Sequence, residues 1–504
     1  MKLLLLSFIA GLASALGFEP LGLWPLTLAG FGVLIWAVER APSLQSALAR
    51  GYWFGVGNFF LGLNWIATAF TYQSAMPAWL GWVSVVLLSL YLAIYPAMAA
   101  GLAWRHGRSD RLKLVLVFAA AWIVTEWLRA TMFTGFAWNP VGVTLLPTQA
   151  SYLAALFGTY GLSGVTMLAA GALFLLFKRD FKRGGILVGS ILLASLLAPL
   201  ASGDMLAARR VPVRIVQPNI GQQDKWLEGY AARNFAILQR LSRSNDPRPR
   251  LLLWPEAAVT EPLENQIASR RYQREGRELR AAIGRLLGPR DLLLTGGVTW
   301  RSTNGLRLTS ATNSVFAMDS AGRILGRYDK AHLVPYGEYL PARPILSQLG
   351  LSRLAPGDVD FDPGPGPQTL DLPLAGRIGF QLCYEIIFSG KVVDRANRPD
   401  FIFNPSNDAW FGRWGPPQHL AQASLRALEE GLPVLRSTPT GISAVVDAEG
   451  RLLHSLPWRT AGVIDAALPA PKPPTPFARG GNVLPFLFAL LLAGLAIAVG
   501  RKRG

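Results

Sequence analysis

The chain has 504 residues, 51% of them hydrophobic, and a mean hydropathy of +0.30. It is too long for one ordinary soluble domain, yet too rich in charge after residue 203 to lie in a membrane throughout. The formal net charge is +18, which first suggests nucleic acid, but basic residues cluster beside apolar stretches, where orientation in a membrane explains them better, and no nucleic-acid partner is expected. With one cysteine, no intrachain disulfide can form.

Eight apolar stretches are candidate membrane helices, because a spanning helix needs about 20 mostly apolar residues. The first also resembles a cleaved signal peptide, since Met1-Lys2 precedes a short apolar run and Ala13-Ser14-Ala15, an alternative that leaves the later orientation unchanged. Pro96, inside the fourth stretch, predicts a kink. The stretches cover residues 3–17, 21–38, 51–70, 78–103, 112–130, 161–177, 184–201 and 483–499.

Basic residues mark every second connection between these stretches, whereas the connections around 17–20, 72–76 and 131–160 contain no Lys or Arg. Because cytoplasmic loops carry the excess of Lys and Arg, the basic connections and the C-terminus are expected in the cytoplasm. Residues 203–480 are then expected on the periplasmic side of a bacterial inner membrane. The basic positions are Arg40, Arg50, Arg105, Arg108, Arg111, Lys113, Lys178, Arg179, Lys182, Arg183, Arg501, Lys502 and Arg503.

Few ionisable side chains interrupt the apolar stretches, which is unlike a transporter. Glu126 and Arg129 are the clearest, and their spacing of three residues on one helix face predicts a mutual ion pair. A transporter with an accessory outer domain is therefore a distant alternative.

Composition divides the chain into a transmembrane helical domain at 1–202, an outer domain at 203–470, and a linker with a last membrane helix at 471–504. In the outer domain, apolar β-branched runs alternate with helical periods at 224–242 and 416–431, which predicts an α/β layered sandwich. The expected strands are 213–217, 251–254, 291–298, 313–318, 376–382, 400–404 and 443–446.

Three reactive groups follow expected strands: Glu256, Lys330 and Cys383. Each alone has an ordinary explanation as a helix cap, a solvated charge or a buried thiol. Together, at the strand ends where α/β folds place ligands, they indicate a nucleophilic thiol with a base and a cation beside it. The histidines match no metal-ligand spacing, so neither a metal nor a cofactor is expected; they are His106, His332, His419 and His454.

The motifs around these groups resemble the nitrilase superfamily of carbon-nitrogen hydrolases, whose Glu-Lys-Cys triad has this order. That resemblance implies an α-β-β-α sandwich for the outer domain. With seven membrane stretches before it and one after it, the whole chain resembles the apolipoprotein N-acyltransferase family. The motifs are Trp-Pro-Glu256, Tyr-Asp-Lys330 with Val-Pro-Tyr-Gly-Glu338 downstream, Cys383-Tyr-Glu385, and Asn404-Pro-Ser-Asn-Asp-Ala-Trp-Phe-Gly412.

The resemblance implies that Cys383 is the nucleophile, Glu256 the general base and Lys330 the stabiliser of the oxyanion. It also implies functional importance for Glu338, Trp226, Tyr384 and Glu385. The reaction it implies moves an acyl chain from a phospholipid to the α-amino group of an apolipoprotein's diacylglyceryl-cysteine, by a ping-pong mechanism through a Cys383 thioester. The main alternative is a membrane-tethered amidase of the same superfamily that hydrolyses a small amide.

Overall fold

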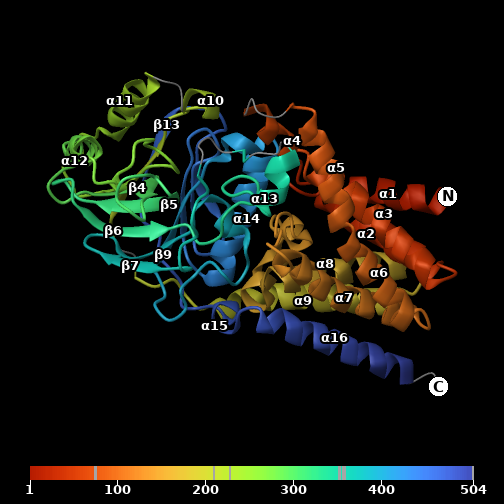
Figure 1. Ribbon diagram of the computed structural model, residues 1–504. Helices are drawn as coiled ribbons and strands as arrows, with labels where there is room; N and C mark the ends of the chain where they lie inside the picture. The colour runs from red at the N-terminus through yellow and green to blue at the C-terminus, as the bar shows by residue number, and fades with distance from the viewer. Residues whose placement is uncertain (73–76, 208–209, 226–228, 350–352, 355–358, 502–504) are drawn as a thin grey trace.

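The computed structural model describes the chain except for residues 73–76, 208–209, 226–228, 350–352, 355–358 and 502–504. Two bodies lie side by side, a bundle of helices and an α/β domain (Figure 1). Both chain ends lie at the far side of the bundle from the α/β domain.

The bundle contains helices long and apolar enough to cross a membrane. Five spans qualify by length and composition among the described residues: Leu80–Gly107, Arg111–Thr131, Gln149–Phe177, Phe181–Leu200 and Val483–Arg501. The bundle helices are α1 (Lys2–Ala15), α2 (Trp24–Glu39), α3 (Leu44–Gly62), α4 (Ile66–Ala69), α5 (Leu80–Leu92), α6 (Ile94–Gly107), α7 (Arg111–Thr131), α8 (Ala154–Phe177), α9 (Phe181–Leu197) and α16 (Val483–Arg501).

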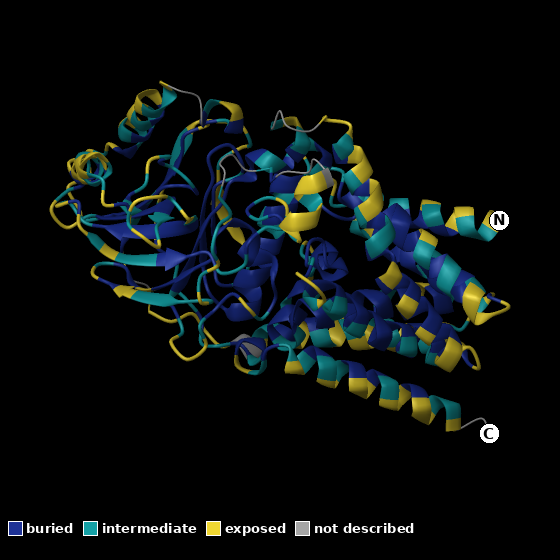
Figure 2. Ribbon diagram, in the orientation of Figure 1, coloured by how far each residue is buried: buried dark blue, intermediate teal, exposed yellow. Residues whose placement is uncertain are grey.

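The outer surface of the bundle is apolar. Exposed residues run along α16 (Figure 2), where Leu487, Leu490 and Leu491 are all more than half exposed. Leu192 and Leu196 of α9 are exposed in the same way. An apolar surface of this extent is expected to face lipid, so the helical region is a membrane region.

Two predicted spans differ from the observed helices. The stretch predicted at 51–70 is displaced and divided, because α3 begins at Leu44 and ends at Gly62, and α4 is a separate short helix. The stretch predicted at 78–103 divides at Ala93 into α5 and α6. The kink predicted at Pro96 explains the division, because proline has no N–H and its ring crowds the carbonyl four residues earlier.

The helix α8 is also interrupted, at Gly158, whose φ of 66° and ψ of −175° are not helical. The turn that restarts at Thr159 is capped by Glu429, whose Oε1 accepts hydrogen bonds from the Thr159 N–H at 2.5 Å and from its hydroxyl at 2.6 Å. Glu429 belongs to α14 (Gly415–Glu430) of the α/β domain. A side chain of one body therefore completes a membrane helix of the other.

The ion pair predicted between Glu126 and Arg129 is present and buried. Their nearest charged atoms are 3.8 Å apart, and each side chain is 3% exposed. Glu126 also accepts a hydrogen bond from the Val141 N–H at 2.9 Å, and Arg129 donates to the Trp138 carbonyl at 2.7 Å. The pair therefore anchors the loop after α7.

The α/β domain contains two sheets. One has the order β13-β1-β2-β4-β5-β6 with β3 beside β4, and the other has the order β12-β11-β10-β9-β8-β7. Parallel pairs join β1 to β2 and β2 to β4 in the first sheet, and β8 to β9 and β9 to β10 in the second. The strands are β1 (Pro212–Gln217), β2 (Leu251–Leu253), β3 (Glu264–Asn265), β4 (Leu292–Arg301), β5 (Ser310–Met318), β6 (Ile324–Asp329), β7 (Thr369–Leu372), β8 (Gly376–Phe380), β9 (Phe401–Pro405), β10 (Val434–Ser437), β11 (Ala444–Val446), β12 (Leu452–Ser455) and β13 (Gly462–Ala467).

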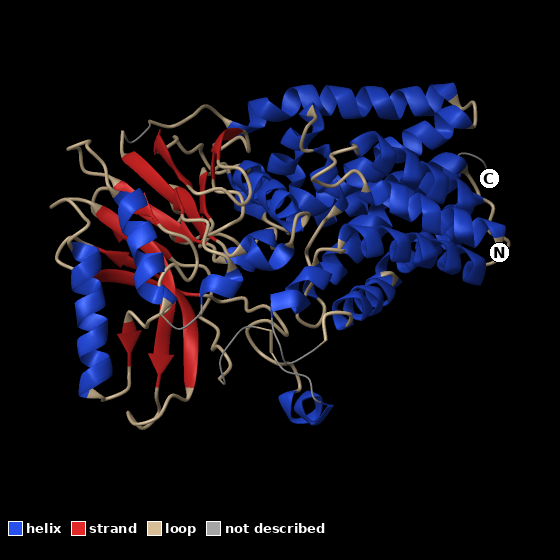
Figure 3. Cartoon of the chain, turned by 90° about the horizontal axis from the view of Figure 1, so that it is seen from above, coloured by secondary structure: helices blue, strands red, loops and turns tan. Residues whose placement is uncertain are grey.

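Alternating side chains make these sheets a sandwich, because successive residues of a strand point to opposite faces. Leu253 packs in one buried cluster with Phe403 of the second sheet. Leu252 instead packs with Leu238 of α11 (Tyr230–Ser242) and Ile283 of α12 (Arg270–Gly284). Helices therefore cover the outer face of the first sheet, while α14 and the bundle lie beyond the second (Figures 1 and 3). The predicted α-β-β-α sandwich is confirmed.

The seven predicted strands correspond to β1, β2, β4, β5, β8, β9 and β11, while β3, β6, β7, β10, β12 and β13 were not predicted. The unpredicted strands are two to six residues long, and β12 is exposed throughout. Such segments carry little apolar periodicity. One buried cluster contains both Trp138 of the bundle and Phe411 of the α/β domain. The two bodies thus share part of a core, and the predicted boundaries of the domains stay a prediction.

Candidate active site

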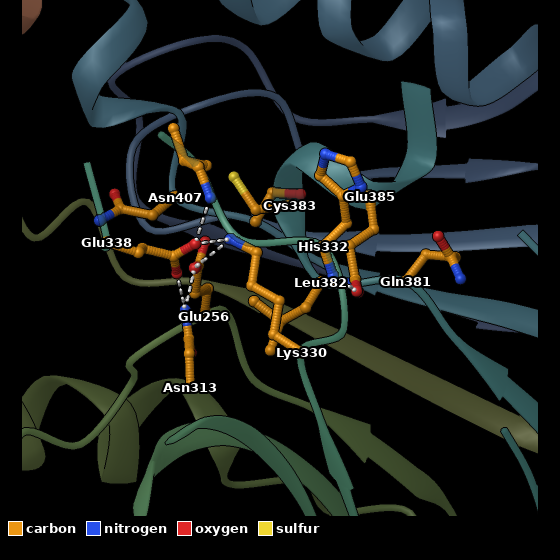
Figure 4. Close-up of polar contacts among 12 residues, drawn as sticks. Glu256, Asn313, Lys330, His332, Glu338, Gln381, Leu382, Cys383, Glu385 and Asn407 are labelled. Carbon is orange, nitrogen blue, oxygen red and sulfur yellow. Dashed lines mark hydrogen bonds and ion pairs between the residues drawn. The ribbon is translucent and has the colours of Figure 1, made fainter. Parts of the chain in front are cut away.

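Three strand ends of the sandwich bring Glu256, Lys330 and Cys383 together (Figure 4). Glu256 lies after β2 and Lys330 directly after β6, both in the first sheet. Cys383 follows β8 of the second sheet and opens the short 3-10 helix Cys383–Ile387. The three residues are 6%, 1% and 5% exposed, so the predicted reactive groups form one buried cluster.

The Asn313 side chain on β5 fixes two carboxylates at once. Its amide nitrogen donates to Glu256 Oε1 and to Glu338 Oε1, each at 2.8 Å. The Lys330 amine lies 2.9 Å from Glu338 Oε2 and 3.9 Å from Glu256 Oε1. The other oxygen of Glu256, Oε2, is buried and has no hydrogen-bond partner among the described residues. Glu256 is thus held by one oxygen while the other is open to accept a proton.

The charges of this cluster define the resting state. Burial disfavours the charged amine of Lys330, but Glu338 and Glu256 outweigh burial and raise the pKa of Lys330 above its ordinary value. Burial, and then the Glu256 carboxylate, raise the pKa of the Cys383 thiol well above its ordinary value, although Lys330 and the Asn407 backbone N–H act in the opposite direction. The amine therefore stays a cation, and the thiol needs a base before it can attack.

The backbone of Cys383 has a left-handed conformation, with φ of 54°. A residue other than glycine is uncommon there and needs its surroundings to hold it. Glu385 contributes, because its carboxylate accepts from the Leu382 N–H at 2.7 Å and from the Ala331 N–H at 2.6 Å. Glu385 therefore ties the cysteine loop to the lysine loop, and its oxygens point away from the thiol (Figure 4).

Tyr384 faces the bundle. Its hydroxyl donates to the Gly135 carbonyl at 3.5 Å, and its ring packs edge-on against Phe388 at a centroid distance of 5.2 Å. Tyr384, the residue after Cys383, thus links the cysteine loop to the loop that follows α7. Trp226, the remaining residue expected to be important, lies outside the described residues.

Sequence reasoning missed Asn313 and Lys225. Lys225 is 5% exposed, and its amine donates to the Glu256 carbonyl at 3.1 Å. Burial lowers the pKa of Lys225 to about 8, against the opposing effect of Glu256 and Cys383. No sequence signal separates this lysine from a solvated one, and Asn313 is an ordinary polar residue in a strand. Among the described residues, no group of three or more His, Cys, Asp or Glu side chains could hold a metal ion.

A sandwich of this kind, with a glutamate, a lysine and a cysteine gathered at its strand ends, places the α/β domain in the carbon-nitrogen hydrolase class, and residues 213–472 match the family described as Carbon-nitrogen hydrolase. The helical region matches a second family over residues 10–172, described as the Apolipoprotein N-acyltransferase N-terminal domain. The match to both families distinguishes this chain from proteins that contain only the carbon-nitrogen hydrolase domain.

Full-length relatives agree with this pairing. An apolipoprotein N-acyltransferase of Rhodopseudomonas palustris is 33% identical over 100% of this chain and 96% of its own length. One of Caulobacter vibrioides is 37% identical over 98% of this chain and 94% of its own length. Among solved structures, an amidase mutant from Nesterenkonia sp. AN1 covers 56% of this chain and 96% of its own, with 16% identity and a TM-score of 0.36.

The chain belongs to the apolipoprotein N-acyltransferase family. It is a membrane enzyme that transfers an acyl group to apolipoproteins. Acyl transfer therefore replaces the two alternatives weighed above, amide hydrolysis and transport.

Proposed function

We propose that the acyl chain passes through a thioester on Cys383, from a phospholipid donor to the α-amino group of the diacylglyceryl-cysteine at an apolipoprotein N-terminus. The observation that carries this proposal is the buried cluster in which Glu256 keeps one carboxylate oxygen open beside the Lys330 cation. A thiol with a raised pKa, a nearby base and a nearby cation are the parts that nucleophilic acyl transfer needs.

In the first step, Glu256 Oε2 takes the proton of the Cys383 thiol and the sulfur attacks the ester carbonyl of the phospholipid. The carbonyl oxygen becomes an oxyanion, and the fixed charge of Lys330 stabilises it. An oxyanion donor of this kind contributes about 3 to 4 kcal/mol. The S–C bond forms, the ester C–O bond breaks, and the proton passes from Glu256 to the glycerol oxygen of the departing lysophospholipid.

In the second step, the neutral α-amino group of the acceptor attacks the thioester. The N–C bond forms and the C–S bond breaks, while Glu256 takes the amine proton and returns it to the thiolate. Water competes with the amine at this stage, so the intermediate needs shielding. The burial of Cys383, 5% exposed, supports such shielding, and the two half-reactions give ping-pong kinetics.

Glu338 has a positioning role in this mechanism. Its Oε2 accepts from the Val334 N–H at 2.8 Å and pairs with the Lys330 amine at 2.9 Å. A flexible lysine held in this way keeps its ammonium at one place, so little charge has to reorganise when the oxyanion forms.

The test uses purified protein and a phospholipid labelled in its acyl chain. Label should appear on the wild-type protein, be removed by neutral hydroxylamine, and move to a synthetic diacylglyceryl-cysteine peptide when that peptide is added. Cys383→Ala is the matched control, because Cys383 is the one cysteine in the sequence. Label that persists in Cys383→Ala, or that leaves the wild type only as free fatty acid, would contradict the proposal.

We further propose eight spans, with the α/β domain on the periplasmic side of the inner membrane and the C-terminus in the cytoplasm. The alternation of basic and uncharged connections supports this orientation. A cysteine introduced in place of Leu306, which is 76% exposed, in the Cys383→Ala background is the probe. It should react with a membrane-impermeant maleimide once only the outer membrane is permeabilised. Reaction solely after lysis of the inner membrane would reverse the orientation.

A further inference from the structure

A second group of buried polar residues lies behind Cys383, on the side of the second sheet. His419 of α14 is fully buried, and its Nε2 lies 3.1 Å from the carbonyl oxygen of Cys383. Its Nδ1 lies 3.0 Å from Asp408 Oδ1 and 3.0 Å from Arg436 Nη2. Arg436 in turn donates to both oxygens of Asp408 at 2.7 Å. The mechanism above uses none of these side chains.

The partners of the imidazole ring decide where its proton lies. The Cys383 carbonyl can only accept a hydrogen bond, so Nε2 must donate. A neutral ring satisfies this when Nδ1 accepts from Arg436, and a charged ring satisfies it when Nδ1 donates to Asp408. Burial, and then Arg436, lower the pKa of His419, which favours the neutral ring. In either state Nε2 carries a proton toward the cysteine backbone.

This hydrogen bond acts on a residue whose backbone conformation needs support. Cys383 has φ of 54°, and its carbonyl orientation is coupled to that angle and to the start of the helix Cys383–Ile387. An anchored carbonyl therefore helps to fix the direction of the Cα–Cβ bond from which the thiol projects. His419 is itself anchored, because Asp408 and Arg436 are both fully buried and paired to each other.

The bundle contributes to the same anchor. Trp138, in the loop after α7, packs on the His419 ring at a centroid distance of 5.1 Å, and Phe411 packs on it at 5.5 Å. The Trp138 indole N–H also donates to Gln418 Oε1 at 2.8 Å, next to His419 along α14. Residues of both bodies thus pack around the His419 ring.

We infer that His419 is a positioning residue for acyl transfer: its Nε2–H holds the Cys383 carbonyl, and so keeps the thiol directed at Glu256 and Lys330. This inference rests on the proposed role of Cys383 as nucleophile. It adds that the main chain of Cys383 is held by His419, and that residues of the membrane bundle help to position the His419 ring.

Two substitutions separate the two ring nitrogens. His419→Gln places an amide near the Nε2 position, so a donor to the Cys383 carbonyl is kept. His419→Asn places an amide near the Nδ1 position, so the contact with Asp408 and Arg436 is kept and the contact with Cys383 is lost. Both replace an aromatic ring by a smaller amide, so a role in packing alone predicts similar losses. His454→Asn, at an exposed position of β12, is the surface control.

The measurement is made on full-length protein in phospholipid nanodiscs. Two rates are followed: thioester formation from labelled phospholipid, and alkylation of the thiol by iodoacetamide between pH 6 and 10. Because the chain has one cysteine, alkylation reports Cys383 alone. Thermal unfolding in the same nanodiscs shows that the compared variants are folded.

His419→Asn should slow thioester formation by roughly 10- to 100-fold with the apparent KM for phospholipid unchanged, because a misdirected nucleophile lowers the chemical step. Its alkylation profile should shift along the pH axis, while His419→Gln stays within a few-fold of wild type in both rates. Equal thioester rates in folded Gln and Asn variants would overturn the inference. A wild type that forms no thioester would instead overturn the proposed function, so the two failures are distinguishable.

Discussion

The two sheets of the sandwich supply the active site in different ways. The first sheet supplies charge through side chains that hold one another, namely Glu256, Asn313, Lys330 and, just downstream, Glu338. The second sheet supplies Cys383, the proposed nucleophile. Cys383 is held through its backbone, by Glu385 at the Leu382 N–H and by His419 at the Cys383 carbonyl. Substitutions in the first sheet should therefore change the charge around the thiol. Substitutions that loosen Cys383 in the second sheet should change the direction in which its thiol points.

The largest effect is expected from Glu256→Gln, which removes the proposed base and keeps the shape of the side chain. The thiol, whose pKa is raised by burial, then has no group to take its proton. Thioester formation should fall by roughly 10²- to 10⁴-fold, as measured in a single turnover with labelled phospholipid. The deficit should shrink at high pH as hydroxide takes over deprotonation, and a deficit that is constant from pH 6 to 10 would argue against a base at this position.

Lys330→Met should cost activity and stability together. The oxyanion loses its cation, which lowers the acylation rate by roughly 10²- to 10³-fold. Two buried carboxylates, at 2.9 and 3.9 Å from the amine, also lose their counter-charge, which destabilises the fold by about 3 to 5 kcal/mol.

The double variant Lys330→Met/Glu338→Gln sharpens the distinction between these two effects. Replacing Glu338 removes one of the two buried carboxylates that lost their counter-charge. This should restore part of the thermal stability without restoring acylation. If acylation returned with stability, Lys330 would be a structural residue of the first sheet rather than the group that stabilises the oxyanion.

A smaller effect is expected from Asn313→Ala, which removes both amide hydrogen bonds at 2.8 Å. Leaving two buried acceptors without this donor should destabilise the fold by about 1 to 3 kcal/mol. The acylation rate should fall by roughly tenfold as the carboxylates lose their fixed positions. Asn313→Asp is the matched control of equal size, and it should be more harmful because it adds a third carboxylate to the cluster.

The smallest effect on acylation is expected at Lys225, where the prediction concerns only how stability changes with pH. Burial lowers the pKa of Lys225 from 10.5 in the unfolded chain to about 8 in the folded one, so between these values the unfolded state binds more protons. Stability due to this residue should therefore rise with pH between about 8 and 10.5, by roughly 3 kcal/mol in total. Thermal unfolding of wild type and Lys225→Met, compared at each pH, isolates this contribution. Parallel curves would mean that folding does not lower the pKa of Lys225.

The sequence predicted the residues that have reactive side chains better than the residues that hold them. Glu256, Lys330 and Cys383 follow strands and carry recognisable neighbours, whereas Asn313 matters only through its position in the sheet. Its partner Glu256 is 57 residues away, and the register that aligns β5 with β4 and β6 is a tertiary property. His419 matched no ligand spacing and carried no local signal for its contact with Cys383.

The helical region shows the same limit of prediction from sequence. The apolar run at 51–70 predicted one helix. Hydropathy alone, however, does not determine the residue at which a helix begins. Ser43 caps α3 by accepting a hydrogen bond from the Ser46 N–H at 3.2 Å, so the helix starts seven residues before the predicted span, at Leu44. A kink at Pro96 was predicted, because proline has a local steric effect that does not depend on tertiary structure, although the division into α5 and α6 was not.

The capping of Thr159 by Glu429 has a consequence for the order in which the protein is made. The two residues are 270 positions apart, so the cap does not exist when the ribosome delivers α8 to the membrane. The part of α8 from Thr159 onward is synthesised before its cap, and the contact with Glu429 can form only after α14 has been made. The completion of this helix end is thus coupled to synthesis of the catalytic domain.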